Sequence, residues 1–404
     1  MQVTSDTLSP ETKQTVLALL RSALWGQKRF PFLPEPGTDW AAVYTELKHQ
    51  TVQHLPVDLL VSADPGNAML YIQNAARNIQ KWHYLMQHQQ AICHDLAQMG
   101  IPCAILKGAA AACYYPKPEH RCMGDIDLIV RPADFDRALA YFRDPWEILH
   151  QDPRHTEIKG NKLLLELHRR FSAFRSPQLR DLLDGQIYAD TAKPEICTLN
   201  GFTFPRLSRT VNGLVLLTHI NTHMEQGLGL RQMIDWMMYV DRELDDALWQ
   251  GEFARQAQAL GLEKLAITVT RMCQLYLGLR EDITWCAGAD PELCRELLEH
   301  TFRQGNFGRK LPQHINIAVG FFSTARNIPG FFREMQRRGM ITWPAAQKYR
   351  ILRPLAWLHQ LFRYLRLGLQ MEHPLRYLHQ AFTSEKTQGS LLDRLEVSRM
   401  NNDH

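Results

Sequence analysis

Met123-Gly-Asp-Ile-Asp-Leu-Ile-Val130 is the stretch that decides how this 404-residue chain is interpreted. Charged and apolar residues alternate in its first half and its second half is fully apolar, which predicts a buried strand over residues 125–130 whose first half lines a site. Asp125 and Asp127 stand two positions apart, so their side chains point to the same face of that strand. Two close carboxylates repel each other, and a buried pair stays ionised only beside a cation.

A divalent cation suits this pair of aspartates. Mg²⁺ is held in proteins by one or two carboxylates together with substrate phosphate oxygens. A third carboxylate is expected at Glu166, because this acid lies in an apolar strand predicted over Leu163–His168. His168 lies two positions further on and shares the face of Glu166. Each has an ordinary alternative role, Glu166 as a surface acid of a hairpin and His168 as a packing or hydrogen-bonding histidine.

A phosphate-binding turn is expected upstream of the aspartates. The apolar run Ile101–Leu106 predicts a strand that ends at Lys107 and Gly108, and a helix is expected directly afterwards over Ala109–Tyr115. Glycine lets a phosphate approach the backbone, and a helix N-terminus offers unpaired N–H groups. Arg121 either binds a phosphate through its guanidinium or forms a structural salt bridge.

The order of these elements resembles that of the polymerase-β-like nucleotidyltransferase superfamily, in which a strand–glycine–helix element precedes Asp-x-Asp and a later acid. More narrowly, the chain is similar to a group of bacterial, largely uncharacterised nucleotidyltransferases. The matching phrases are Leu106-Lys-Gly108, Arg121-Cys-Met-Gly-Asp-Ile-Asp-Leu-Ile-Val130 and Glu166-Leu-His168, with weaker likeness at Leu19–Gly26, Leu217-Thr-His219 and Leu230–Asp235.

The resemblance implies an enzyme that uses Mg²⁺, or Mn²⁺ in its place, to move a nucleoside monophosphate from an NTP to a hydroxyl or phosphate acceptor with release of pyrophosphate. It implies Asp125, Asp127 and Glu166 as the catalytic metal ligands, with Glu166 on the acceptor side. The wider superfamily has a serine after the glycine of the phosphate turn, where this chain has Ala109. Lys107 is the candidate to replace the lost contact. At the phosphate turn the resemblance carries over only Gly108. The full set of candidate nucleotide-binding residues is Lys107, Gly108, Arg121, Gly124 and His168.

Four segments follow from the change of pattern along the chain. Residues 1–99 are predicted as an N-terminal helical region, 100–206 as a small mixed-sheet catalytic domain, 207–383 as a C-terminal helical domain and 384–404 as a polar, loosely ordered tail. The expected fold class is therefore α+β, with a polymerase-β-like nucleotidyltransferase domain flanked by helices.

Composition places the chain among ordinary globular proteins, with 45% hydrophobic and 22% charged residues. Its eight cysteines include no Cys-x-x-Cys pair, which gives no support to a zinc ribbon or a thioredoxin-like site. Met1-Gln-Val-Thr-Ser-Asp-Thr7 lacks the features of a signal peptide. No apolar run approaches the ~18 residues of a membrane span. A cytoplasmic protein is expected.

A basic segment near the C-terminus is compatible with more than one class of acceptor. Between Phe331 and Gln380 there are nine basic and two acidic side chains, so the rest of the chain is net acidic. This segment is a solvated helical face, a surface for an RNA acceptor, or a weak contact with a membrane surface. A small molecule, peptide or protein is favoured over RNA as the acceptor. A different class of function is a pseudoenzyme that binds nucleotide, or a partner protein, without transfer.

Three polar residues of the predicted C-terminal helices, His219, His223 and Asp235, are candidates for a structural or a site role. His219 and His223 share one helical face but lack the glutamate of a zinc-protease motif, so helix packing is favoured over metal binding. Asp235 is expected either to pair with Arg231, one turn earlier, or to face the cleft between the domains.

Overall fold

A seven-stranded mixed sheet forms the centre of the computed structural model, which describes residues 8–143, 145–160, 162–310, 328–369, 390–397 and 400. The strand order is β3-β4-β5-β2-β1-β7-β6. The strands are β1 (Cys103–Leu106), β2 (Ile126–Val130), β3 (Glu147–Gln151), β4 (His155–Gly160), β5 (Leu163–His168), β6 (Glu195–Leu199) and β7 (Phe202–Arg206). The predicted α+β class, with a mixed sheet flanked by helical regions, is confirmed.

The middle of the sheet follows from the apolar sequence of its strands. β1 and β2 are buried on both faces, as expected for strands covered by helices on either side. β2 runs antiparallel to β1 and parallel to β5, while β4 and β5 form an antiparallel hairpin. β6 and β7 form a second hairpin that the sequence analysis did not predict.

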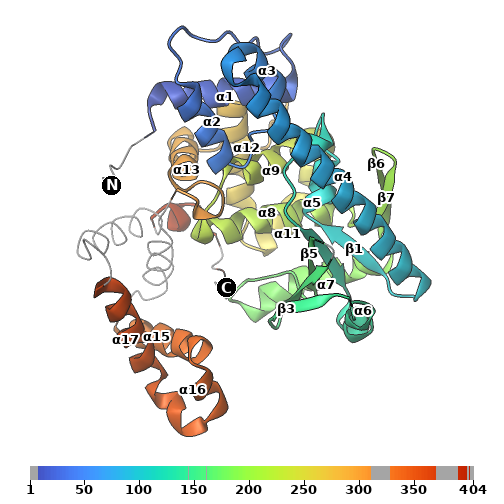
Figure 1. The fold of residues 1–404 in the computed structure, drawn as a ribbon, viewed down its shortest axis with the longest axis vertical. Helices are drawn as coiled ribbons and strands as arrows, with labels where there is room; N and C mark the ends of the chain where they lie inside the picture. Colours follow the sequence, from blue (N-terminus) through green and yellow to red (C-terminus); the bar gives the residue numbers. More distant parts are fainter. Residues whose placement is uncertain are drawn as a thin grey trace.

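From residue 8 onward, the α-helices that precede the sheet are α1 (Pro10–Trp25), α2 (Trp40–His49), α3 (Val57–Ala63) and α4 (Ala68–Gln98). The long helix α4 crosses one face of the sheet near β1 and β7 (Figure 1). Its second half packs Trp82, Leu85, Ile92 and Leu96 into the core that covers this face. The α-helices described between the strands are α5 (Gly108–Ala112), α6 (Phe135–Tyr141) and α7 (Pro177–Ala192).

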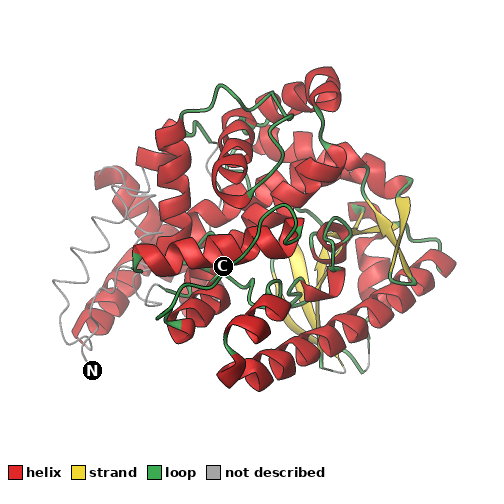
Figure 2. Ribbon diagram, turned by 90° about the horizontal axis from the view of Figure 1, so that it is seen from above, coloured by secondary structure: helices red, strands yellow, loops and turns green. Residues whose placement is uncertain are grey.

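As far as the structure describes it, the chain after β7 is helical, and Figure 2 shows the strands gathered on one side of the molecule. The α-helices from β7 to Gln304 are α8 (Arg209–Gln226), α9 (Leu230–Glu243), α10 (Asp246–Leu248), α11 (Ala254–Ala259), α12 (Glu263–Leu277) and α13 (Pro291–Gln304). Their apolar faces share one core with α1 and α2. The indole N–H of Trp25 donates to the carbonyl of Leu277 at 2.7 Å, which ties the first helix to the end of α12.

The basic segment contributes α15 (Ile328–Thr342), α16 (Pro344–Lys348) and α17 (Ala356–Leu369). α15 and α17 cross closely at Gly339, where an added Cβ would lie 1.9 Å from the carbonyl oxygen of Ala356. Six basic side chains of this segment are exposed: Arg333, Lys348, Arg350, Arg353, Arg363 and Arg366. Residues 370–380, with Glu372 and Arg376, lie outside the described residues.

The expectation of a loosely ordered tail is wrong for the part of it that the structure describes. Leu391, Leu392, Leu395 and Met400 are buried in the helical core. The spacing of these apolar residues gives the segment one face that packs, and the backbone carbonyl of Met400 accepts a hydrogen bond from Arg175. Among the described helices, none is long and apolar enough to cross a lipid bilayer.

Candidate active site

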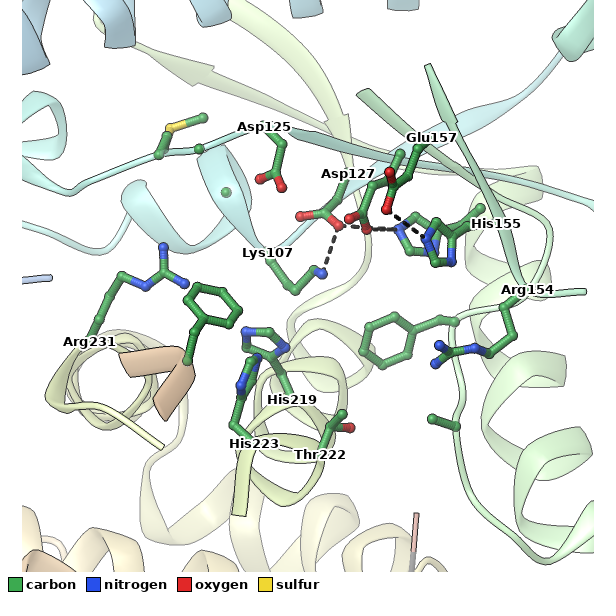
Figure 3. Close-up of a pocket in the computed structure, with 18 of the residues that line it drawn as sticks. Lys107, Asp125, Asp127, Arg154, His155, Glu157, His219, Thr222, His223 and Arg231 are labelled. Carbon is green, nitrogen blue, oxygen red and sulfur yellow. Dashed lines mark hydrogen bonds and ion pairs between the residues drawn. The ribbon is translucent and has the colours of Figure 1, made fainter. Parts of the chain in front are cut away.

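Three acidic side chains meet where β2 and β5 run side by side. Asp127 of β2 lies opposite Glu166 of β5 in the parallel register, and Asp125 directly precedes β2. All three line a cavity of about 320 Å³ between the sheet and the C-terminal helices (Figure 3). The structure thus brings together the three acids that the sequence analysis selected.

Two cationic groups offset the charge of these acids. Lys107 Nζ lies 2.7 Å from Asp127 Oδ1. His168 Nε2 lies 3.1 Å from the same oxygen and 3.2 Å from Glu166 Oε2. His168 therefore sits between the two carboxylates of adjacent strands, and its other ring nitrogen, Nδ1, is buried without a hydrogen bond.

The surroundings shift the pKa values of Asp125 and Glu166 in opposite directions. Burial, and then the charges of Asp127 and Glu166, raise the pKa of Asp125 to about 6. Burial would also raise the pKa of Glu166, but the hydrogen bond from His168 and the charge of Lys107 hold it far below its usual range. Burial opposes the charged form of His168, yet the same carboxylates raise its pKa. Glu166 is therefore ionised, whereas Asp125 forms no hydrogen bond or ion pair among the described residues, and the more distant charges of Lys107 and Arg231 offset its burial only in part.

The turn after β1 is shaped by an unusual backbone. Lys107 has φ 47° and Gly108 has φ 21°, a conformation that costs free energy at a residue with a side chain. This turn aims the lysine at Asp127. The helix after it, α5, has five residues and begins at Gly108, so its dipole is weaker than that of the longer helix expected from the sequence.

Arg121 forms a buried ion pair with Asp235 of α9. Its guanidinium makes two hydrogen bonds to the carboxylate of Asp235, Nε to Oδ1 at 2.6 Å and Nη2 to Oδ2 at 2.7 Å. The hydroxyl of Tyr115 donates to the same carboxylate at 2.6 Å. Asp235 does not pair with Arg231 among the described residues, so that expectation is wrong. The partner comes from the loop before β2, which sequence spacing along α9 does not indicate.

The cavity has a second polar wall that the sequence analysis did not identify. β4 contributes His155 and Glu157, which lie directly opposite His168 and Glu166 in the antiparallel register. Burial, and then the positive charge of His168, lower the pKa of His155 to about 4. The repeated pattern, His-x-Glu on β4 against Glu-x-His on β5, was the signal that could have revealed this wall.

The C-terminal helices close the cavity from the other side. The side chains that they contribute are His219, Thr222 and His223 of α8, Arg231 of α9 and Phe307, which follows α13. His219 and His223 were predicted as packing residues, and their rings do contact each other at 4.4 Å between centroids. Both also face the cavity. Burial, and then the charge of His223, lower the pKa of His219 well below its usual value.

The donor set fits a divalent cation. Asp127, Glu166 and His168 each offer one ligand atom, and these atoms lie within 4.8 Å of one another. Asp125 is outside this group but lines the same cavity. Two carboxylates at this spacing, with a third beside them, supply the oxygen ligands that Mg²⁺ and Mn²⁺ prefer. The placement of Gly124 next to Asp125 leaves the backbone open there, because an added Cβ would meet no atom within 4 Å.

Comparison with known proteins supports a family assignment. No curated protein matches the chain. One solved structure that matches is an antigenic nucleotidyltransferase-like protein from Paracoccidioides brasiliensis, at 17% identity and a TM-score of 0.32, over 50% of this chain and 94% of that one. A family model described as "uncharacterised nucleotidyltransferase" matches residues 36–278. Because that match covers more than half of the sequence, the chain belongs to this family of uncharacterised nucleotidyltransferases.

Proposed function

We propose that this protein transfers a nucleoside monophosphate from an NTP to an acceptor and releases pyrophosphate, with Asp125, Asp127 and Glu166 holding Mg²⁺ or Mn²⁺. The observation that carries the proposal is the convergence of these three acids in one cavity of a nucleotidyltransferase family member. A divalent cation at such a site offsets the charge that develops on the phosphate oxygens and lowers the pKa of the attacking hydroxyl.

The protein's own groups would divide the remaining work. Lys107 forms an ion pair with Asp127. Its long side chain can turn to the triphosphate once Asp127 binds the metal ion instead. Gly108 and Gly124 leave room for phosphate oxygens beside the backbone. His168 holds Asp127 and Glu166 in place, and Glu166 serves the acceptor side. Arg121 acts through the fold, since its guanidinium is already bound to Asp235.

In the proposed reaction an acceptor oxygen attacks the α-phosphorus in line. A new phosphorus–oxygen bond forms to the acceptor, and the bond between the α-phosphorus and the bridging oxygen of pyrophosphate breaks. The proton of the acceptor leaves to a carboxylate or to solvent. The acceptor group that enters this cavity of about 320 Å³ can be carried by a small molecule, a peptide or a protein.

Asp125→Asn tests the proposal with the least disturbance, because Asp125 forms no ion pair or hydrogen bond among the described residues. Loss of one charged ligand should reduce transfer at least about 100-fold. Thermal stability should be unchanged or raised, since burial already disfavours the charged form of this residue. The assay uses the four NTPs labelled at the α-phosphate, with Mg²⁺ or Mn²⁺, and a cell extract as the source of acceptors.

Asp136→Asn is the matched control, because the Asp136 side chain is 90% exposed and forms an ion pair with the side chain of Arg169, away from the cavity. It should label the acceptor as the wild type does. If Asp125→Asn kept full transfer, the proposed site would be refuted.

Nucleotide binding without transfer is the second candidate. Two observations favour it: Ala109 stands where the resemblance places a serine, and Lys107 and His168 already neutralise Asp127. Calorimetric NTP binding that is independent of Mg²⁺, together with no pyrophosphate release, would support this candidate against the enzyme.

A further inference from the structure

Phe307 is an exposed aromatic side chain that lines the cavity. It lies in η5 (Asn306–Gly308), beyond the residues that the family model matches, and lines the cavity opposite the sheet. Its side chain is 53% exposed. Its backbone has φ 55° and ψ 32°, a left-handed conformation that is costly for an aromatic residue. Neither exposure nor strain is explained by packing.

The surrounding structure sustains this strained position. The backbone N–H of Phe307 donates to the carbonyl of Gly227 at 3.0 Å. Gly227 has φ 116°, and an added Cβ would lie 1.9 Å from the nitrogen of Gly308, so the turn after α8 and the turn after α13 are in direct contact. Asn306 is fully buried. It accepts a hydrogen bond from Gln232 at 2.7 Å and donates one to Thr51 at 2.8 Å.

Two groups flank the ring of Phe307. The guanidinium of Arg231 lies 5.5 Å from the ring centroid, and the ring of His223 lies 4.9 Å away in an edge-on arrangement. Arg231 has no ion pair and no hydrogen-bond acceptor among the described residues, and its Nε is buried. Figure 3 shows Arg231 and Asp125 on the same side of the cavity, with Lys107 between them and His155. A guanidinium without an ion-pair partner in the described part of the chain, beside an exposed aromatic ring, has the composition of a site for an anionic ligand that carries a ring.

We propose that Phe307 is the surface on which the base of the NTP stacks, and that Arg231 binds the phosphates of the same nucleotide. This inference rests on the proposed function and assigns the nucleotide to the side of the cavity formed by α8, α9 and η5. The acceptor then approaches from the side of β4 and β5. Arg231 supplies the guanidinium contact that the sequence analysis assigned to Arg121.

The test measures equilibrium binding by calorimetry, with the four α,β-methylene nucleoside triphosphates and inorganic tripolyphosphate as probes, in the presence of Mg²⁺. In Phe307→Ala, loss of base stacking should reduce the affinity for the nucleotide that the wild type binds most tightly by about 5- to 100-fold. Tripolyphosphate binding should stay within about twofold, because it has no base to stack. Phe307→Trp should retain nucleotide binding, and Arg231→Gln should weaken both kinds of probe.

Two further variants exclude a purely structural role. Phe307→Gly should lose nucleotide affinity while thermal stability is unchanged or rises, because glycine adopts the left-handed conformation without strain. Phe362→Ala is the control, since Phe362 of α17 is also exposed, at 65%, and does not line the cavity.

The outcomes separate this inference from the proposed function. If the wild type binds no nucleotide, the proposed function fails and the inference fails with it. If the wild type binds and Phe307→Ala binds equally well, only the inference is overturned. An equal loss of tripolyphosphate affinity in Phe307→Ala would also overturn it, because the ring would then act on the phosphates.

Discussion

A buried arginine in the wall of a cavity can bind an anionic ligand or form an ion pair that stabilises the fold. In this structure Arg121 forms such an ion pair, with Asp235. Its side chain is 4% exposed, and its guanidinium donates to the carboxylate of Asp235, which also accepts a hydrogen bond from Tyr115. The pair joins the loop before β2 to α9, so it fixes the position of the strand that carries Asp127 relative to the C-terminal helices.

Arg121→Met should therefore reduce the free energy of unfolding by about 3–5 kcal/mol, because it leaves the carboxylate of Asp235 buried without a partner. The double variant Arg121→Met, Asp235→Leu should recover much of that loss, since both charges are gone. Urea unfolding of the two variants measures the difference. If Arg121→Met kept its stability and lost nucleotide binding instead, Arg121 would be a phosphate ligand, as the sequence suggested.

The site could be predicted from sequence where its residues are close along the chain. The spacing of Asp125 and Asp127 and the strand around Glu166 were enough to select the three acids. The partner of Arg121 is 114 residues away, and local spacing pointed to the wrong ion pair for Asp235. Phe307 could not be selected either, because its exposure and its left-handed backbone are properties of the folded turn.

At the scale of elements, the crossing of α8 and α9 sets the wall of the cavity that faces the sheet. Gly213 of α8 allows this close contact, because an added Cβ would lie 2.3 Å from the hydroxyl oxygen of Tyr239 in α9. The helix that carries His219 and His223 is thereby held against the helix that carries Arg231.

Gly213→Ala should destabilise the protein by about 1–3 kcal/mol through this clash. The same substitution at Gly185, in the exposed face of α7, meets no atom within 4 Å. It should stabilise the protein by about 0.5–1 kcal/mol, because alanine favours a helix more than glycine does. Thermal unfolding of the two variants should give shifts of opposite sign. A stabilising Gly213→Ala would contradict the close packing of α8 on α9.

Helices and central strands could be predicted from hydrophobic periodicity, while the β6–β7 hairpin was missed. Its strands carry few buried residues, since β6 is mostly exposed at the edge of the sheet. The signal that was present is Asn200-Gly201, with φ 49° and 84°, a pair typical of a two-residue hairpin turn. Without a buried face, the alternating pattern around that turn was too weak to identify the strands.

At the scale of the whole molecule, residues far apart in the sequence share one core. Leu20 of α1, Leu47 of α2 and Val269 of α12 belong to the same buried cluster, and Lys13 pairs with Glu299 of α13 at 2.6 Å. The N-terminal helices are therefore braced against the C-terminal helices that line the cavity. Amphipathic patterns predict that such helices pack, but they do not identify the partner, because any apolar face of similar width would serve.

This shared core buries ionisable groups whose protonation affects the stability of the whole protein. His300 of α13 is 3% exposed. Burial, and then the charge of Arg303, lower its pKa to about 4. A histidine in the unfolded chain has a pKa of about 6.5. Between these two values the unfolded state binds more protons, so the stabilising contribution is complete above pH ~6.5 and is lost as the pH falls toward 4.

His300 should therefore account for up to about 3 kcal/mol of the stability lost between pH 6.5 and pH 4. His300→Gln should flatten the dependence of unfolding free energy on pH over this interval, whatever its effect on stability at pH 8. Urea unfolding at several pH values measures the slope. His94→Gln, at an exposed position of α4, is the matched control and should leave the slope unchanged. An equally steep slope in His300→Gln would show that this buried imidazole does not govern the acid sensitivity of the core.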